Sequence, residues 1–197
     1  MTKNSYHHGN LKYTILSEAL HLLNSKNFDE ISFRLISRNI GVVSSAPYNH
    51  FKDKKHLIKE IIALGEKKLL NLISSEKNKS KIPVEQLLLI AKAYLNFAIN
   101  EKALFNLMFS KANEELLFLS DKIVLQFNLI ITEKFKKGKR LKLTAKGSAI
   151  TAWSMLHGLA ITINNSKKEN LESLWSIKLD SILKEMSAIW GKGVSEK

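Results

Sequence analysis

Apolar residues recur every three or four positions along most of the chain, which is the spacing of amphipathic α-helices rather than of β-strands. Only two prolines interrupt the pattern, and runs of β-branched residues are short. The predicted helices, with their caps, cover about 10–25, 32–40, 44–50, 53–75, 84–99, 101–110, 114–137, 144–164 and 170–190. The sequence therefore predicts an all-α fold of about nine helices.

The clearest local motif is a pair of short helices separated by a tight turn. Ser32 is placed to cap the first helix, and Gly41 is placed to end it, because many helices end at a left-handed glycine. Either Ser44 or Ser45 can cap the second helix, and Pro47 falls in its first turn, where a missing N–H costs little. This arrangement is typical of a helix-turn-helix that places its second helix in the major groove of DNA.

Charge supports this interpretation through its placement. The 197-residue chain carries a formal net charge of +13. Residues 32–59 hold six basic side chains against one acidic side chain, and they include two of the three arginines. A clustered basic segment suits a phosphate backbone, where neutralised phosphates release their counterions.

The composition also excludes several classes of protein. Without cysteine there are no disulfides, thiolate metal sites or cysteine nucleophiles. The longest apolar run is too short to span a membrane, and the first ten residues do not form a secretory signal. We therefore expect a cytoplasmic protein with no membrane partner.

The second helix of the motif presents small and polar side chains that can read base edges. Asparagine pairs with adenine, serine bonds to most bases, and alanine can contact a thymine methyl group. The residues expected to face bases are Ser44, Ser45, Ala46, Asn49 and His50. The residues expected to hold phosphates on either side are Arg34, Tyr48, Lys52 and Lys54.

These residues resemble the N-terminal domain of TetR-type bacterial transcriptional regulators. The segments that carry the resemblance are Ser32-Phe33-Arg34, Gly41-Val42, Ala46 to Phe51 and Lys54 to Leu57. The opening Tyr6 to Leu11 is similar to the start of one branch of that family, and Trp153 to Gly158 is similar to the Trp-His-Gly motif of the same branch. Where the family usually has serine after Gly-Val, this chain has Val43.

The resemblance implies a helix-turn-helix domain at 1–55 and a helical effector-binding and dimerisation domain at 56–197. It implies a homodimer on a palindromic operator, acting as a ligand-responsive regulator that we expect to be a repressor. It also extends the phosphate contacts to Ser32, His50 and Lys55.

The resemblance further implies an effector cavity in the C-terminal helices, for which we expect a small apolar effector. The residues expected to line it are Phe97, Phe105, Met108, Phe109, Phe127, Trp153 and His157. The last two helices are expected to pair with those of a second subunit. The residues expected at that dimer interface are Gly158, Trp175, Leu179, Ile182 and Met186.

No pattern indicates an enzyme, a cofactor or a metal site. The six histidines lack metal-ligand spacing, and the chain has no glycine-rich phosphate loop and no nucleophile elbow. Two other hypotheses remain open at this point. One is an all-α protein that sequesters small molecules, which would leave no footprint on DNA. The other is a basic architectural protein, which would bind DNA without sequence preference.

Overall fold

The computed structural model describes residues 11–26, 28–135, 144–166 and 176–194, and within them the regular structure is helical. The prediction of an all-α fold is confirmed. The α-helices are α1 (Leu11–Leu23), α2 (Phe33–Ile40), α3 (Lys54–Lys77), α4 (Pro83–Asn100), α5 (Lys102–Met108), α6 (Leu116–Phe135), α7 (Ala145–Asn165) and α9 (Leu179–Val194). Two short 3-10 helices, η2 (Phe28–Glu30) and η3 (Ala46–Asn49), lie on either side of α2.

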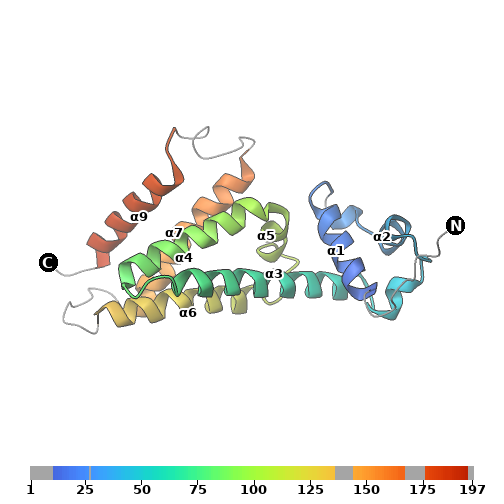
Figure 1. Ribbon diagram of the computed structural model, residues 1–197, viewed down its shortest axis with the longest axis horizontal. Helices are drawn as coiled ribbons and strands as arrows, with labels where there is room; N and C mark the ends of the chain where they lie inside the picture. Colours follow the sequence, from blue (N-terminus) through green and yellow to red (C-terminus); the bar gives the residue numbers. More distant parts are fainter. Residues whose placement is uncertain (1–10, 27, 136–143, 167–175, 195–197) are drawn as a thin grey trace.

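The helix α3 runs along the long axis of the molecule and joins its two parts (Figure 1). At one end it packs against α1, beside the small group of helices that holds α2 and η3. Further along it packs against α4 and α5. The helices α4, α6 and α7 pack against one another, and α9 lies outside them against α4 and α7.

The packing of α3 follows from an apolar residue at every fourth position. Leu57, Ile61, Leu69 and Ile73 are 0–1 % exposed, so one stripe of α3 is buried from end to end. Gly65 occupies the middle of the stripe, where a Cβ atom would lie 2.5 Å from Met108 Sδ. The glycine therefore allows α5 to approach α3 closely.

The helix ends around the turn are as predicted. Ser32 Oγ accepts the N–H of Leu35 at 3.1 Å, which caps α2. Gly41 ends α2 with φ 73°, in the left-handed region. Asp53 Oδ1 accepts the N–H of His56 at 2.7 Å and caps α3. Each of these ends depends on a contact within a few residues, which a sequence pattern can show.

The short helix predicted at 44–50 is present, with Ser45 at its N-cap and His50 at its C-cap, but it is a 3-10 helix rather than an α-helix. The structure has one 3-10 turn at Ala46–Asn49, and Ser45 makes no capping bond through its side chain. Pro47 lies in the first turn, where its missing N–H is compatible with either kind of helix. The backbone uses i→i−3 bonds, including Tyr48 N to Ser45 O at 3.1 Å.

Two predicted helix starts in the C-terminal part are also corrected. The α6 helix begins at Leu116 rather than at 114, because Asn113 folds the preceding turn by donating to Met108 O and accepting from Glu115 N. The last helix begins at Leu179 and extends to Val194, whereas we predicted 170–190. Residues 176–178 are not helical, and Ser176 has a left-handed φ of 53°. None of the helices in the described ranges is long and apolar enough to cross a lipid bilayer.

Candidate nucleic-acid interface and effector cavity

The segment 44–49 is largely exposed and packs against the buried aromatic side chains Phe33 and Phe51. Pro47 is buried, and Phe51 is fully buried beneath it. The Tyr48 ring meets Phe33 edge to face at 4.9 Å, yet Tyr48 is 61 % exposed. Its ring therefore anchors the segment while much of the side chain stays open to a ligand.

The expected base-reading residues lie together on this segment. Ser44, Ser45 and Asn49 are exposed, and Ala46 and His50 are half-buried. Packing against Phe33 and Phe51 holds the backbone of this segment in place, so these side chains project from a fixed backbone.

A hollow of about 560 Å³ lies between η2, the start of α2 and the turn after it. Ser32, Arg34, Arg38 and Ser44 line this hollow, and both arginines are exposed. Ser32 is the N-cap of α2, so its hydroxyl oxygen is already an acceptor for a backbone N–H. Two guanidinium groups beside an exposed polar segment are suited to holding a phosphate backbone in register.

The lysines after the turn are engaged within the chain. Lys54 Nζ donates to Asp29 O at 3.0 Å and lies 4.5 Å from the centre of the Phe28 ring. Lys55 pairs with Glu114 at 2.5 Å. Among the residues expected to hold phosphates, the structure thus places Arg34, Tyr48 and Lys52 in exposed positions, and it gives Lys54 and Lys55 partners of their own.

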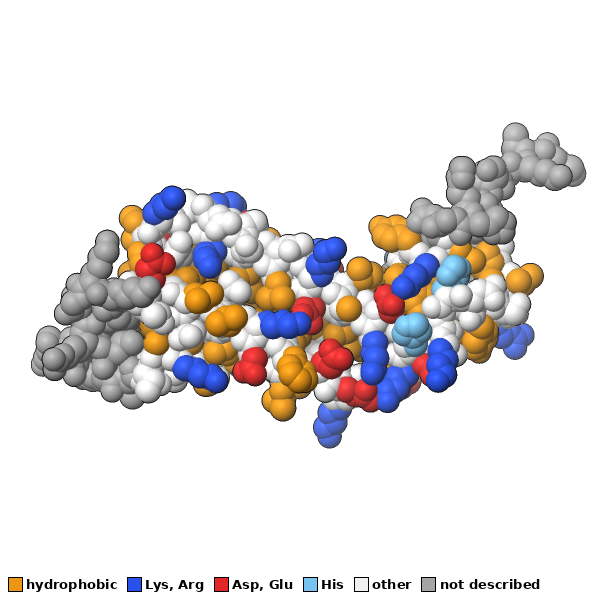
Figure 2. Space-filling model, turned by 90° about the horizontal axis from the view of Figure 1, so that it is seen from below, with side chains coloured by type: hydrophobic (Ala, Val, Ile, Leu, Met, Phe, Trp, Pro, Cys, Tyr) orange, Lys and Arg blue, Asp and Glu red, His pale blue; other side chains and the backbone are white. Residues whose placement is uncertain are grey.

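Glu114 links α3 to the loop before α6. Its carboxylate contacts Lys55 and, at 3.1 Å, Lys59. The hydrogen bond and the negative charge of Glu114 raise the pKa of Lys55, and the hydrogen bonds from Lys55 and Lys59 lower the pKa of Glu114. Figure 2 shows the same pattern over this end of the molecule, where acidic side chains lie among the Lys and Arg side chains.

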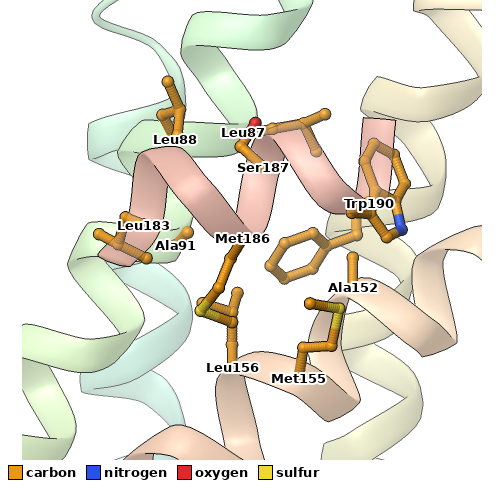
Figure 3. Close-up of a pocket in the computed structure, with 11 residues that line it drawn as sticks. Leu87, Leu88, Ala91, Ala152, Met155, Leu156, Leu183, Met186, Ser187 and Trp190 are labelled. Atoms are coloured by element: carbon orange, nitrogen blue, oxygen red, sulfur yellow. The ribbon is translucent and has the colours of Figure 1, made fainter. Parts of the chain in front are cut away.

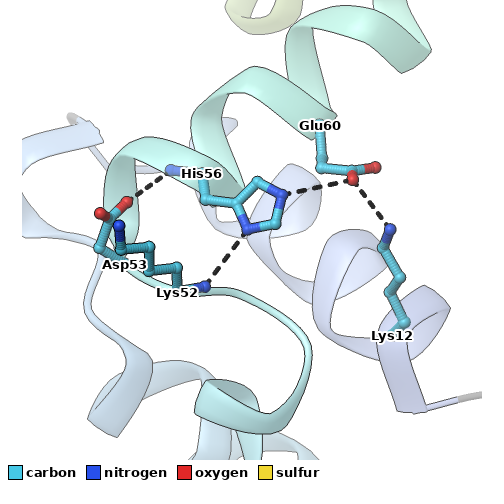
Figure 4. A network of polar contacts seen from close by, with 5 residues as sticks. All are labelled: Lys12, Lys52, Asp53, His56 and Glu60. Carbon is cyan, nitrogen blue, oxygen red and sulfur yellow. Dashed lines mark hydrogen bonds and ion pairs between the residues drawn. The ribbon is translucent and has the colours of Figure 1, made fainter.

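His56 organises the start of α3 (Figure 4), and sequence reasoning did not select it as a site residue. Its Nδ1 accepts the backbone N–H of Lys52 at 3.2 Å, so its proton lies on Nε2. Nε2 faces Glu60 Oε1 at 3.6 Å, and Lys12 of α1 bonds to the same oxygen at 2.9 Å. These contacts tie the segment after the turn to α1 and α3. The Asp53-x-x-His56 spacing is the signal that could have indicated them.

An aromatic cluster lies where α4, α5 and α7 meet. Tyr94 Oη and His157 Nδ1 are joined by a 2.8 Å hydrogen bond, and Trp153 stacks on the His157 ring at 5.1 Å between centroids. Phe105 and Phe109 complete the cluster, with Phe109 4.6 Å from His157. Burial lowers the pKa of His157 and raises that of Tyr94, so both side chains are neutral near pH 7. The Trp153 indole N–H is also buried.

Because the pKa of His157 lies below its ordinary value of 6.5 in the folded protein, protonation opposes folding. The unfolded chain binds this proton more readily than the folded chain does. Neutral His157 therefore leaves the folded state at full stability above about pH 6.5, and the free energy of unfolding decreases as the pH falls below that value. We expect the free energy of unfolding to fall between pH 7.5 and 5.5. Urea denaturation of the protein and of His157→Gln would check this, since Gln does not titrate. Equal pH dependence in both proteins would contradict the assignment to His157.

A separate apolar cavity lies between α4, α6, α7 and α9 (Figure 3). Its volume is about 50 Å³, and its lining is almost wholly apolar. The lining residues are Leu87, Leu88, Ala91, Phe127, Ala152, Met155, Leu156, Leu183, Met186, Ser187 and Trp190. Pockets for drug-sized ligands have volumes of about 300–1,000 Å³, so in this conformation the cavity has room for a small apolar group only.

The residues expected around an effector fall into three places. Phe127 lines the cavity. Phe97, Phe105 and Met108 are buried in the core, and Phe105 also belongs to the aromatic cluster. The other three, Phe109, Trp153 and His157, lie in that cluster and not in the cavity lining.

Of the residues expected at a dimer interface, Gly158 lies on α7, and Leu179, Ile182 and Met186 lie on α9. Gly158 is exposed, and a Cβ atom added there would meet nothing within 4 Å. Leu179 and Ile182 are half-buried, whereas Met186 points into the cavity (Figure 3). Trp175 lies outside the described residues, as do residues 6–10 of the opening motif.

The outer face of α7 is a stripe of small residues: Thr151, Ser154, Gly158 and Thr162 are all exposed. The two threonine hydroxyls donate to carbonyl oxygens of their own helix, at 2.9 and 2.8 Å. With its hydroxyls satisfied and no large side chain, this face allows another helix to approach closely.

Within the described residues, no group of three or more His, Asp or Glu side chains is arranged to hold a metal ion.

Comparisons with known proteins agree with the geometry of the N-terminal part. Residues 15–61 match the family model of bacterial regulatory proteins of the tetR family. This match does not reach Trp153 to Gly158, so membership of the Trp-His-Gly branch stays a prediction. No curated protein matches the chain.

Solved structures share the fold over nearly the whole chain. A protein of unknown function from Rhodococcus sp. RHA1 is 22 % identical, with a TM-score of 0.81 over 98 % of this chain and 100 % of that one. The TetR-family regulator PfmR from Thermus thermophilus is 17 % identical, with a TM-score of 0.68 over 91 % and 97 %. AibR, solved with isovaleryl coenzyme A and operator DNA, is 14 % identical, with a TM-score of 0.65 over 92 % and 96 %.

Residues 15–61 thus match the family model of tetR-type regulatory proteins, and the chain as a whole shares the fold of solved TetR-family regulators.

Proposed function

We propose that the protein is a homodimeric, ligand-responsive repressor that binds a palindromic operator. The observation that carries this proposal is the exposed polar segment 44–49, seated on buried Pro47 and Phe51 beside two exposed arginines. We divide the chain into a DNA-binding domain at 1–55 and an effector-binding and dimerisation domain at 56–197. The α3 helix begins at that boundary and carries its buried stripe into both.

In the DNA complex, segment 44–49 enters the major groove. Asn49 is the residue best suited to a bidentate pair with adenine, and Ser44, Ser45 and Ala46 contact neighbouring bases. Arg34 and Lys52 hold the phosphates on either side, and the exposed part of Tyr48 adds a third contact. Lys54 and Lys55 contribute only after leaving Asp29 and Glu114, so we assign the main phosphate contacts to the first three residues.

The dimer forms through the outer faces of α7 and α9. The side chains on the α7 face around Gly158 are small. Ile150 on α7 and Ile189 on α9 add large apolar side chains that are 44 % and 67 % exposed. A second copy that covers these side chains removes them from water. The two-fold axis of such a dimer requires half-sites about 34–36 Å apart or a multiple of that distance.

Gly158→Leu tests this interface cleanly. We expect the variant to fold at least as stably as the native protein, since its Cβ atom meets nothing within 4 Å and leucine favours a helix by up to about 1 kcal/mol over glycine. We expect dimer dissociation to become about tenfold easier or more, because the larger side chain blocks close helix approach. Sedimentation equilibrium measures this. Asp121→Leu on the exposed side of α6 is the matched control, and equal effects of the two substitutions would place the interface elsewhere.

The effector acts through the C-terminal helices. We propose that an apolar group enters the cavity between α4 and α9, where Met155 and Met186 can change rotamer to enlarge it. The isovaleryl coenzyme A bound by AibR is one example of an effector with a small apolar group. Binding changes DNA affinity only by the difference in effector affinity between the two forms of the dimer, and α3 joins the two domains that must move together.

Footprinting on the DNA upstream of the protein's own gene tests the proposal. A homodimeric repressor is expected to protect two symmetric half-sites, because each subunit contacts one half-site. Ligand binding without any protected site would instead support a protein that sequesters small molecules.

A further inference from the structure

A cleft much larger than the apolar cavity lies on one side of α3, between the N-terminal helices and the C-terminal bundle. Its volume is about 770 Å³, against about 50 Å³ for the cavity. One wall comes from the end of α1 and from η2, the floor from the start of α3, and the other wall from α5 and the loop after it. Segment 44–49 takes no part in the lining, so the cleft is distinct from the DNA-reading surface.

The cleft is basic. Lys26, Lys54, Lys55 and Lys102 line it, whereas Asp29 is the one acidic residue in the lining. The Lys54 ammonium group is held in place by Asp29 O and by the Phe28 ring, and it keeps two further N–H donors. Glu114 offsets the charge of Lys55, so Lys26, Lys54 and Lys102 are the cations best placed to attract an anion.

Neutral donors stand between these cations. Asn106 in the opposite wall accepts a hydrogen bond from Asn164 on its Oδ1 at 3.4 Å, which leaves its side-chain N–H groups to donate elsewhere. Asn24 lines the wall formed by α1. Several donors around a multiply charged anion are characteristic of phosphate recognition.

The remaining lining is apolar and includes Phe28, Ile58 and Leu107. An inorganic anion alone would leave this surface in contact with water, whereas an organic molecule that carries a phosphate can use both parts of the cleft. A phosphate group carries about two negative charges at neutral pH, whereas a carboxylate group carries one. A ligand with a phosphate group therefore matches three lysines better than a ligand with a single carboxylate group.

We propose that this cleft binds a phosphorylated organic small molecule, with its phosphate on Lys26, Lys54 and Lys102 and its organic part against Phe28 and Leu107. Lys26 belongs to the N-terminal helices and Lys102 to the C-terminal bundle, so the bound molecule bridges the two. The site does not depend on the operator or on the apolar cavity, and its test needs no DNA.

Isothermal titration of the full chain with ADP as the probe tests the site. We expect one saturable site per chain, weaker binding of inorganic pyrophosphate, and no binding of adenosine, which lacks phosphate. The double variant Lys26→Gln/Lys102→Gln should weaken ADP binding about tenfold or more. Both substitutions are at exposed positions outside the surface assigned to DNA, and circular dichroism checks that the variant is folded.

The matched control is Lys67→Gln/Lys146→Gln, which removes two exposed lysines that do not line the cleft. It should leave ADP affinity unchanged. Equal weakening by both double variants would mean attraction to the overall positive charge and would overturn the proposal. Absence of ADP binding, or adenosine binding as tight as ADP binding, would also overturn it. Equal affinity for pyrophosphate and ADP would refute the role of the apolar wall.

Discussion

Arg34→Ala is expected to weaken operator binding about tenfold or more near 0.1 M salt, because a dimer loses one charged phosphate contact in each subunit. The loss should be similar for every DNA sequence, since phosphates carry no sequence information. The slope of log affinity against log salt should become shallower by about two, because each phosphate contact contributes about 0.9 and a dimer loses two such contacts. Fluorescence anisotropy with labelled duplex, repeated over a series of salt concentrations, measures both quantities.

Arg34 is exposed, so the substitution should not alter the fold. The control is Lys146→Ala, which removes a positive charge from an exposed position at the start of α7. If Arg34→Ala leaves the salt slope unchanged, or if Lys146→Ala flattens it equally, Arg34 does not contact the backbone. A change confined to some DNA sequences would instead place Arg34 among the base-reading residues.

Phe105→Ala should have the largest effect on stability. Phe105 is fully buried at the centre of the aromatic cluster, with Tyr94, Phe109 and His157 around its ring. Truncation removes the buried ring and leaves a cavity among rigid aromatic neighbours, which costs about 3–5 kcal/mol of unfolding free energy. Since whole domains are stable by only about 5–15 kcal/mol, the variant should unfold at a clearly lower urea concentration.

Phe118→Ala provides the comparison, because it deletes the same atoms from a side chain that is 68 % exposed on α6. We expect its midpoint in urea to stay close to that of the native protein. A similar loss of stability in both variants would show that Phe118 is covered in solution. A small loss in both would show that the side chains around Phe105 can move to fill the cavity left by its ring.

The features predicted correctly from the sequence are those decided by neighbouring residues. The Ser32 cap, the Gly41 end and the Asp53 cap each involve bonds within a few positions. The short helix at Ala46–Asn49 was predicted, but its 3-10 form was not. A cap and a proline in the first turn are compatible with either kind of helix, and four residues are too few for periodicity to distinguish them.

The site was less predictable because distant segments decide which side chains are free. Lys54 and Lys55 fit the motif by position, but their acceptors, Asp29 O and Glu114, come from other elements. In the same way, Met186 follows the apolar pattern of an outer helix, yet α4 and α7 surround it with the cavity lining. Amphipathic spacing identifies a buried face without indicating whether its partner is the same chain or a second copy.

The aromatic cluster also depends on a contact between distant segments that the sequence does not indicate. Trp153 and His157 were both expected to line the effector cavity, and their rings stack. The hydrogen-bond partner of His157 is Tyr94 on α4, sixty-three residues away, and nothing local to either residue indicates the pairing.

The assignment of segment 44–49 to DNA recognition can be tested by selecting binding sites from a random duplex library with the purified protein. We expect enrichment of a palindrome whose half-sites lie about one helical turn, or a multiple of it, apart. We also expect Asn49→Ala to change the preferred bases at a fixed position in each half-site, because a bidentate pair with adenine discriminates by about 1–3 kcal/mol. Retention of DNA without enrichment of any sequence, or the same enriched site with and without the Asn49 side chain, would contradict the assignment of segment 44–49 as the reader of DNA.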